Sequence, residues 1–415
     1  MKTSQTAAPA PINRRQLVAL ALSSAALTAC GGGGGSELDS PTSSARRRIR
    51  QDLLDKTAGE AVAAGLVSAS LVYADRQSSV TAAAGLREKG GPAATGINDW
   101  LRIGSASKAM TACMAAQLIE RGQLSWTLSL ADALPDLAPT MRPEFRAVTI
   151  EQLLAHRGGL IAMNNEADVG AFLAFLAEQT EPLPSNFEGR RRFAAAWALG
   201  QAQPGVTPGR DFQYSNVDYM LVGMILEARS NKSFTALFDE LIGPLVSAPG
   251  QPGLSLGLPA TAGSARQRGH VGARGAVRVF EGYPPELQVW QQVLSQAAGG
   301  VFATATGYAK WQQLHQKALG GEPTQLPAGY VQRLRAVNAG YALGWEAGAL
   351  PEAFKDQVCL FHSGIVEGFS AYSVIALDGQ FAIGAFTNTE GEGDDADWVL
   401  KLLIKAILDL RAGWK

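Results

Sequence analysis

The stretch Leu101-Arg102-Ile103-Gly104-Ser105-Ala106-Ser107-Lys108 decides how this chain of 415 residues is interpreted. Ser105 and Lys108 are three residues apart at the start of a strongly helical segment, so their side chains share one face of the helix. A serine hydroxyl is a weak nucleophile until a base takes its proton, and a lysine whose pKa is lowered by burial or by nearby cations can be that base. The helix N-terminus also offers N–H groups to a developing oxyanion. Roughly one or two Ser-x-x-Lys tetrads occur by chance in a chain of this length, so the tetrad alone has a structural alternative. Its position at a helix start favours a nucleophilic serine beside its activating lysine.

The pattern of apolar residues on either side of this stretch predicts the secondary structure. Apolar side chains recur at helical spacing after Ser105 and Gly122 can end the helix, which indicates a helix over 106–121. From there to about residue 297 the sequence predicts helices and loops, and the pattern returns to strands from Leu360. The expected strands are 66–74, 79–84, 371–377 and 381–387, and the expected outer helices are 47–64 and 398–410.

Strands near both chain ends and a long helical middle predict an α+β fold. We expect one antiparallel sheet that is built from both ends of the chain and flanked by the first and last helices. The helical region, about 105–297, is then an insertion packed beside the sheet. Antiparallel hairpins in place of strand–helix–strand units argue against a dinucleotide-binding fold. A cleft between the two halves is the natural place for a site.

Two later triplets carry further candidate groups. Tyr214-Ser215-Asn216 precedes an apolar helix expected over 217–229; its phenol can relay a proton, and its amide can hold a substrate carbonyl or the lysine. His362-Ser363-Gly364 ends an apolar run, and its histidine can bind a substrate carboxylate or shuttle a proton. Taken alone, each triplet has a structural alternative: an asparagine that caps a helix, and a histidine with satisfied hydrogen bonds in the core.

Together, the order and separations of the three motifs resemble the serine penicillin-recognising family, which includes class C β-lactamases, D-alanyl-D-alanine carboxypeptidases and related esterases. The approach to Ser105 and the stretch 149–160, Thr-Ile-Glu-Gln-Leu-Leu-Ala-His-Arg-Gly-Gly-Leu, are similar to family motifs. So are Ala298-Gly299-Gly300-Val301 and Tyr341-Ala342-Leu343-Gly344-Trp345. The resemblance extends over about residues 50–410 and implies a β-lactamase/transpeptidase-like fold.

The resemblance also implies a role for each candidate residue. Ser105 would be the acylated nucleophile, Lys108 its activator and Tyr214 a proton relay with Asn216 beside it. The strand residues Ser363 and Gly364 would contact the substrate. The backbone N–H groups of Ser105 and Ile365 would form the oxyanion hole, and His362 would stand where β-lactamases usually have a lysine.

Two departures from the β-lactamase pattern bear on the substrate. The variant His-Ser-Gly-Ile-Val-Glu-Gly-Phe, which starts at His362, looks closest to the carboxypeptidase and esterase-like branch. Met163 falls about where class C enzymes carry a glutamine that contacts the substrate, and Asn164 and Asn165 are nearby substitutes. Carboxypeptidase or esterase-like activity is therefore expected ahead of β-lactamase activity.

The other motifs in the chain give weaker evidence for a functional site. Gly253-Leu254-Ser255-Leu256-Gly257 fits a nucleophile elbow, but that motif needs a strand before it and a helix after it, and prolines flank this one. His156 is expected to be structural. No cluster has metal-ligand spacing and no phosphate-binding loop is present, so we expect neither a metal nor a cofactor.

The first 46 residues are expected to be an export signal followed by a flexible tether. Residues 1–29 combine a charged stretch at Arg14-Arg15, a short apolar run and small residues, as a bacterial export signal does. Leu27-Thr28-Ala29-Cys30 resembles a lipobox, which would make Cys30 the lipidated first residue of the mature chain. Residues 30–46, rich in glycine, would be a flexible tether, and 47–415 the folded domain. We therefore expect a protein of the periplasm or cell envelope, held by a lipid anchor.

The composition favours a folded protein and argues against a nucleic-acid-binding one. The chain is 47% hydrophobic, enough for a sizeable core, and its net charge of −1 gives no basic excess for nucleic acid. We expect a serine hydrolase that acts through an acyl-enzyme on Ser105 and cleaves D-Ala peptide amides, β-lactams or small esters. Its partners would be small molecules or peptidoglycan peptides. The alternative is a non-catalytic penicillin- or peptidoglycan-binding lipoprotein of the same fold, against which the intact set of reactive residues argues.

Overall fold

The computed structural model describes residues 43–76, 78–246, 253–263, 265–350, 354 and 357–414. The expected export signal, Cys30 and the tether as far as residue 42 lie outside the described residues. Within the chain, Arg47–Lys415 forms one compact unit. The first helix, α2 (Ser43–Ala63), begins four residues before the position that the sequence predicts.

The centre of the fold is an antiparallel sheet of seven strands in the order β2-β1-β12-β11-β10-β9-β8. Strand β1, from the start of the domain, pairs with β12, from its end, with Ser70 opposite Phe386. This pairing confirms the prediction of a sheet built from both ends of the chain. The strands are β1 (Ser68–Asp75), β2 (Ser79–Gly85), β8 (Gly340–Ala342), β9 (Trp345–Ala349), β10 (Val358–Val366), β11 (Phe369–Ala376) and β12 (Phe381–Thr387).

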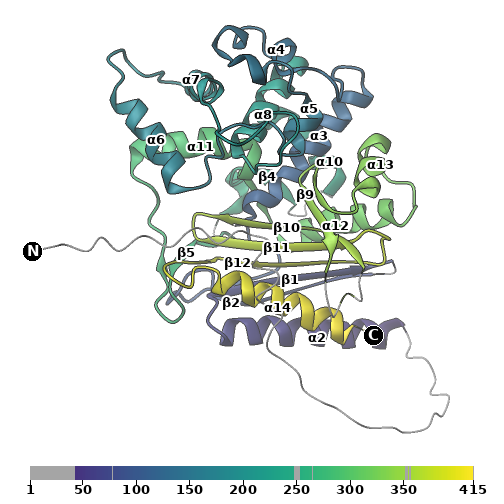
Figure 1. Cartoon of the computed structure of the whole chain (residues 1–415). Helices are drawn as coiled ribbons and strands as arrows, with labels where there is room; N and C mark the ends of the chain where they lie inside the picture. The colour runs from purple at the N-terminus through teal and green to yellow at the C-terminus, as the bar shows by residue number, and fades with distance from the viewer. Residues whose placement is uncertain are drawn as a thin grey trace, which may run out of the picture. The chain divides into compact units, whose positions relative to one another are not determined.

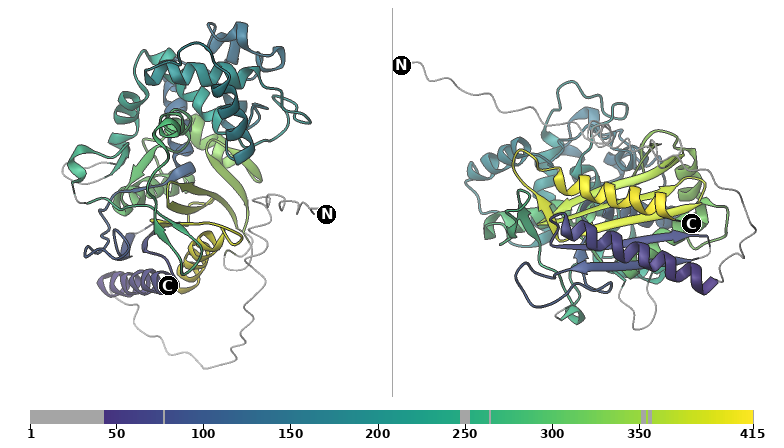
Figure 2. Two further views of the ribbon diagram at one scale, coloured as in Figure 1. Left: turned by 90° about the vertical axis from the view of Figure 1, so that its left-hand side faces the viewer. Right: turned by 90° about the horizontal axis from the view of Figure 1, so that it is seen from below.

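Both faces of this sheet are covered. Every residue of β11 and β12 is buried, so these central strands need apolar partners on each side. Helices α2 and α14 (Trp398–Gly413) lie side by side along one face, and the helical region lies on the other (Figures 1 and 2). Trp414 stacks on Tyr73 with ring centroids 3.5 Å apart, which fastens the end of the chain to β1.

The helical region packs around α8 (Asn216–Ser230), in which every residue from Val217 to Leu226 is buried. Ser215 caps this helix by accepting a hydrogen bond from the backbone N–H of Asp218. Its other helices are α3 (Lys108–Glu120), α4 (Leu130–Ala133), α5 (Ile150–Leu154), α6 (Glu166–Ala177), α7 (Phe187–Gly200), α9 (Phe234–Leu241), α10 (Gly243–Val246) and α11 (Pro285–Gly299). Two helices follow this region, α12 (Ala305–Leu319) and α13 (Ala328–Ala336), and α12 packs against β1, β2 and β12.

The insertion is not entirely helical, so that part of the prediction is wrong. Short strands form two additional three-stranded sheets, ordered β3-β7-β4 and β13-β5-β6. They escaped prediction because strands of two or three residues show no alternation of apolar and polar residues. The strands are β3 (Leu101–Arg102), β4 (Leu254–Leu256), β5 (His270–Gly272), β6 (Arg278–Val279), β7 (Val301–Ala303) and β13 (Thr389–Gly391). The main-sheet strands also resume at Gly340, earlier than expected.

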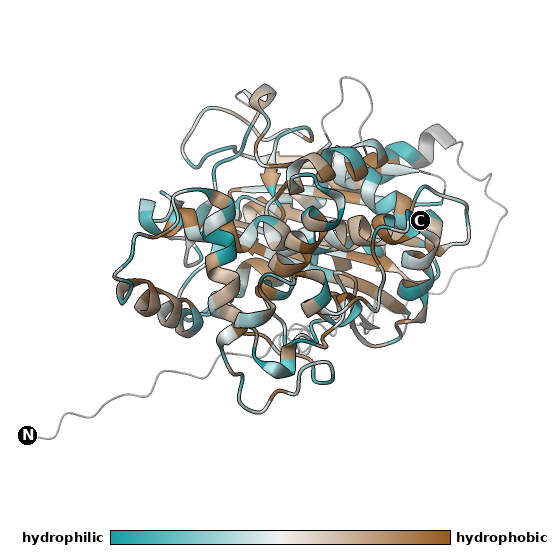
Figure 3. Cartoon of the chain, turned by 90° about the horizontal axis from the view of Figure 1, so that it is seen from above, coloured by the Kyte–Doolittle hydropathy of each residue, from teal (hydrophilic) through white to brown (hydrophobic). Residues whose placement is uncertain are grey.

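The distribution of apolar residues follows these layers. Seen from the helical side, the strands of the sheet are mostly brown, which marks them as apolar (Figure 3). In the part of the chain that the structure describes, no helix combines the length and the apolar character needed to span a bilayer.

Candidate active site

A tight turn places Ser105 next to strand β10 of the sheet. Gly104–Ser107 forms a single 3₁₀ turn and α3 begins at Lys108, so the α-helix starts later than predicted. Gly104 has φ +50°, and a Cβ there would lie 2.7 Å from the backbone N of Ile365. A Cβ on Gly364 would lie 1.9 Å from the carbonyl oxygen of Ile103 and 3.0 Å from the N of Ser105. Only glycine at both positions lets the two backbones approach this closely.

This approach brings the two expected oxyanion donors together. The N–H groups of Ser105 and Ile365 belong to the two backbones that meet at Gly104 and Gly364. Strand β9 pairs with β10 only as far as Phe361, so β10 from His362 onward has no β9 partner on that edge. An extended substrate can therefore lie along this edge of β10 and present its carbonyl to both N–H groups.

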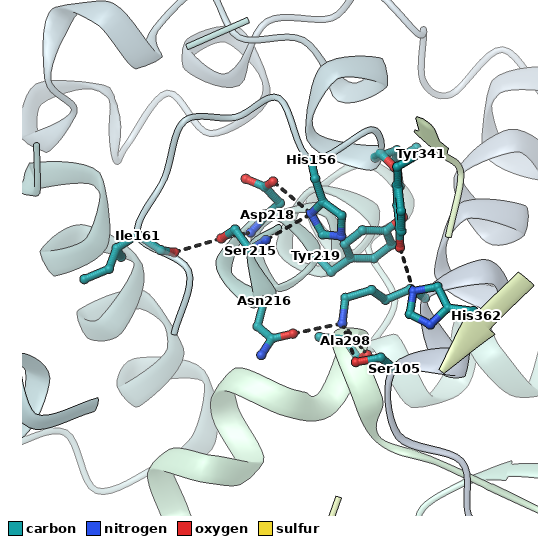
Figure 4. A network of polar contacts seen from close by, with 12 residues as sticks. Ser105, His156, Ile161, Ser215, Asn216, Asp218, Tyr219, Ala298, Tyr341 and His362 are labelled. Atoms are coloured by element: carbon teal, nitrogen blue, oxygen red, sulfur yellow. Dashed lines mark hydrogen bonds and ion pairs between the residues drawn. The ribbon is translucent and has the colours of Figure 1, made fainter. Parts of the chain in front are cut away.

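Lys108 is the centre of the polar contacts. Its Nζ donates to Ser105 Oγ at 3.1 Å, to Asn216 Oδ1 at 2.8 Å and to the carbonyl oxygen of Ala298 at 2.9 Å (Figure 4). The side chain is fully buried. Lys108 belongs to α3, and its partners belong to the preceding 3₁₀ turn, to α8 and to the end of α11. These contacts hold the amine within proton-transfer distance of the serine hydroxyl.

The Tyr214-Ser215-Asn216 triplet lies on the other side of Lys108. The Lys108 Nζ lies 4.8 Å from the centroid of the Tyr214 ring, a cation–π arrangement. Asn216 is fixed at both ends of its amide, because its Nδ2 donates to the carbonyl oxygen of Met163 at 3.1 Å. The side chain of Met163 is buried, and only its backbone carbonyl oxygen contacts Asn216. Asn165 caps helix α6.

His362 stands on β10 next to the nucleophile and is buried. Its Nδ1 lies against the carbonyl oxygen of Ser363, and its Nε2 is 3.1 Å from the hydroxyl of Tyr341 on β8. In the neutral imidazole, the Nδ1 proton is therefore donated to Ser363 and Nε2 accepts from Tyr341. The next side chain beyond Gly364, Ile365, is 41% exposed and forms an apolar edge beside the oxyanion donors.

A buried His–Asp pair packs behind the site, and the sequence pattern had suggested no chemical role for either residue. The His156 Nδ1 lies 3.2 Å from Asp218 Oδ2 and accepts the N–H of Ser215 at 3.2 Å (Figure 4). The His156 ring packs against those of Tyr214 and Tyr341, with centroids 4.3 and 4.5 Å away.

Burial raises the pKa of Asp218 well above its usual range, although the charge of Lys108 and the N–H of Gly158 act in the opposite direction. A protonated Asp218 can donate to His156 Nδ1, which leaves the imidazole proton on Nε2. The pair thereby fixes the ring that supports Tyr214. The position of His156 inside the family-like stretch 149–160 was the one sequence feature that pointed to this pair.

The structure thus brings Ser105, Lys108, Asn216 and His362 together around one edge of β10, with Tyr214 beside them. Ser255 lies apart from them in the interior of β4, opposite Phe302, and not at a turn between a strand and a helix. The described residues contain no group of three His, Cys, Asp or Glu side chains placed to hold a metal ion.

A Ser-x-x-Lys turn held between an antiparallel sheet and a helical region defines the β-lactamase/transpeptidase-like class of serine hydrolases. The chain belongs to the beta-lactamase family, whose model matches residues 54–406.

Relatives and solved structures agree with this assignment. Penicillin-binding protein 4 of Amycolatopsis lactamdurans is 30% identical over 240 residues, which cover 56% of this chain and 55% of that protein. The chain thus spans about half the length of this relative. A β-lactamase/D-alanine carboxypeptidase from Pseudomonas syringae has the same fold, with a TM-score of 0.65, 16% identity, and coverage of 87% of this chain and 98% of that one. A D-amino acid amidase from Ochrobactrum anthropi SV3 also has this fold, with a TM-score of 0.65 and 17% identity. The match covers 88% of this chain and 98% of that one.

Proposed function

We propose that this protein hydrolyses amides of D-alanine through an acyl-enzyme on Ser105. The observation that supports the proposal most directly is the set of three hydrogen bonds at Lys108, one of which ends on the hydroxyl of Ser105. A lysine buried beside a serine at the foot of an open strand edge is suited to acyl transfer.

The proposed reaction has two halves. In the reactive form Lys108 is the free amine: its two N–H groups donate to Asn216 and Ala298, and its lone pair accepts the hydroxyl proton of Ser105. It takes this proton while Oγ attacks the substrate carbonyl carbon, and the N–H groups of Ser105 and Ile365 stabilise the oxyanion. The C–N bond then breaks, and the leaving amine receives a proton through Tyr214. Water attacks the ester on Ser105 in the second half, with the same groups returning the proton to Oγ. Asn216 keeps the Lys108 amine directed at the serine.

The preference for D-Ala amides over β-lactams rests on His362. The strand position where β-lactamases usually carry a lysine holds an imidazole hydrogen-bonded to Tyr341. When its imidazole is protonated, His362 gains an N–H and a positive charge that can bind the carboxylate of a leaving amino acid. Proteins of similar fold include a D-alanine carboxypeptidase, a D-amino acid amidase and a D-stereospecific amidohydrolase. These neighbours support D-configured amides as the proposed substrate class.

The test is a comparison of substrates on the soluble protein, residues 37–415. We expect release of D-alanine from N-acetyl-D-Ala-D-Ala, no release from the L,L isomer, and slow turnover of penicillin. Rapid turnover of penicillin without release of D-alanine would assign the protein to the β-lactamases. Cleavage of p-nitrophenyl esters alone would assign it to the esterases, and binding without any turnover would support the non-catalytic alternative.

We also propose that the protein works in the cell envelope on peptidoglycan peptides, attached by a lipid on Cys30. The lipobox-like sequence Leu27-Thr28-Ala29-Cys30 supports the anchor. A substrate class found in the cell wall supports the location.

A further inference from the structure

The start of helix α2 gathers positive charge on the outer layer of the fold. Four arginines lie within residues 46–50, and the first acid of the helix is Asp52. Like charges three or four residues apart on a helix repel one another, and the positive end of the helix dipole adds to that repulsion. The clustering therefore costs the helix stability, and its reason lies outside the helix.

One of these arginines has a partner inside the folded unit. Arg50 Nη1 lies 2.9 Å from Asp75 Oδ2, and the Arg50 guanidinium lies 4.7 Å from the centroid of the Trp414 ring. Arg47 and Arg48 are exposed, and neither forms an ion pair with a carboxylate that the structure describes. Their charges are therefore available to an anionic partner.

The surroundings of these two arginines add an apolar group and a further charge. Ile49 is 55% exposed, the largest exposed fraction among the large apolar side chains of the described residues. The turn after β1 adds Arg76, an exposed residue whose Nη2 donates to the backbone carbonyl of Asp378. We define the α2 patch as four side chains: Arg47, Arg48, Ile49 and Arg76. An apolar side chain among guanidinium groups suits the headgroup region of a bilayer, where lipid phosphates lie above acyl chains.

The charges of the outer layer are concentrated at one end. The end of α14 lies beside the start of α2, because Trp414 contacts Arg50. The other end of α14 follows a stretch that carries four acids: Glu392, Asp394, Asp395 and Asp397. An anionic surface therefore attracts the end of this layer that holds the α2 patch and repels the opposite end.

The chain before α2 favours a membrane as the anionic partner. Twelve residues, 31–42, separate Cys30, the proposed site of lipid attachment, from α2. Even when fully extended they span only about 40 Å. A lipid on Cys30 would thus keep the α2 patch close to the bilayer, so that a weak contact is made at high local concentration.

We propose that the α2 patch docks the folded unit on an anionic phospholipid bilayer. Helices α2 and α14 cover one face of the sheet, and the turn that carries Ser105 leads into α3 on the other face (Figures 1 and 2). Docking therefore leaves the candidate active site turned away from the lipid. The inference extends the proposed lipid anchor from attachment to orientation. Three arginines give roughly a hundredfold preference for an anionic surface, too little to hold the unit there without the anchor.

Vesicle sedimentation of the lipid-free protein, residues 37–415, tests the docking. At low ionic strength, binding to vesicles of equimolar phosphatidylglycerol and phosphatidylcholine should exceed binding to pure phosphatidylcholine by about tenfold or more, and high salt should remove the difference. Arg47→Gln/Arg48→Gln should lower binding to the anionic vesicles by about tenfold or more. Arg146→Gln/Lys232→Gln removes the same charge from exposed positions of the helical region. This matched control should bind as the wild type does.

Fluorescence from single labelled cysteines tests the orientation. Cys113 and Cys359 are buried, so a polarity-sensitive thiol dye attaches selectively to an introduced exposed cysteine. The dye on Ile49→Cys should shift to shorter wavelength when anionic vesicles are added. The dye on Ser185→Cys, an exposed position of the helical region, should not shift.

The outcomes separate docking from the anchor and from the reaction. Equal binding to both kinds of vesicle, or unchanged binding of Arg47→Gln/Arg48→Gln, would overturn the docking. A shift at residue 185 and none at residue 49 would overturn the orientation. Binding of dextran sulfate through Arg47 and Arg48 without binding of vesicles would replace the lipid with a soluble polyanion and overturn the membrane as partner. Neither assay uses the lipid on Cys30 or hydrolysis, so a failure of either of those proposals is seen separately.

Discussion

Among single residues, Lys108 matters most to the proposed reaction. Its buried amine contacts the Ser105 hydroxyl, the Asn216 amide and the carbonyl oxygen of Ala298. Lys108→Ala should lower the rate of acylation by at least ~100-fold, the effect typical of a proton-transfer group. Stopped-flow acylation by a chromogenic β-lactam measures it. Acylation of the variant at the normal rate would exclude Lys108 as the activating base, provided that circular dichroism shows the variant folded.

His362 is expected to act on the leaving group more than on the nucleophile. His362→Gln keeps a hydrogen-bonding side chain but removes the imidazole that contacts Tyr341. It should lower kcat/KM for N-acetyl-D-Ala-D-Ala by about tenfold or more, the value of a hydrogen bond to a charged group. Hydrolysis of an ester without a leaving carboxylate should change much less. Equal losses on both substrates would show that His362 serves the chemistry common to both.

His315 links stability to pH. Its Nδ1 lies 3.0 Å from the carbonyl oxygen of Trp311 and its Nε2 3.0 Å from the hydroxyl of Tyr330, and burial lowers its pKa to about 4. An unfolded histidine titrates near 6.5, so the unfolded chain binds the extra proton between the two values and stability falls as the pH decreases from about 6.5 to 4.

The His315 contribution to this loss should be about 3 kcal/mol, from the difference of the two pKa values. Thermal unfolding across this pH range measures it. His315→Gln should be less stable at neutral pH and should lose less stability on acidification than the wild type. The same pH slope in both proteins would contradict the assignment.

The approach of the nucleophile turn to β10 is the decisive feature at the scale of elements. Gly364→Ala should push Ile103 and Ser105 away from the strand and lower acylation by at least ~100-fold, the effect of losing an oxyanion donor. Gly348→Ala on the neighbouring strand is the control, because its Cβ would meet nothing closer than 3.8 Å. Acylation that survives in Gly364→Ala would mean that this close approach is not needed to form the oxyanion hole.

The elements that the sequence predicted well are those with long regular patterns. The strands near residues 70 and 380 are runs of seven or eight mostly buried residues, and the helix after Ser105 repeats its apolar residues at helical spacing; the structure confirms these elements. The three-residue strand that contains Ser255 has too few residues for a pattern, and its pairing with β7 is a tertiary contact.

Only part of the site could be predicted in the same way. The three motifs gave Ser105, Lys108, Asn216 and His362, because each is a reactive or polar group in a recognisable triplet or tetrad. The acceptor at Ala298 is a backbone carbonyl, so its residue type carries no signal. Asp218 and Tyr341 depend on long-range packing against His156 and His362, which spacing along the chain does not reveal.

At the scale of the whole molecule, the folded unit from Arg47 onward is expected to be tied to a membrane by the segment before it. Cys30→Ser should release the full-length protein from membranes into the soluble fraction of an expressing bacterium. Metabolic labelling with an alkyne fatty acid should mark the wild type and not the variant. Unchanged membrane partition of Cys30→Ser, or labelling of the variant, would contradict the lipid anchor.

Intact-protein mass spectrometry of residues 37–415 during incubation with penicillin G, followed by peptide mapping, tests whether Ser105 is the acylated nucleophile. We expect a single adduct that persists for minutes or longer and maps to the peptide containing Ser105. Ser105→Ala should form none. An adduct that maps to Ser255, or one that forms equally on the Ser105→Ala variant, would contradict this assignment.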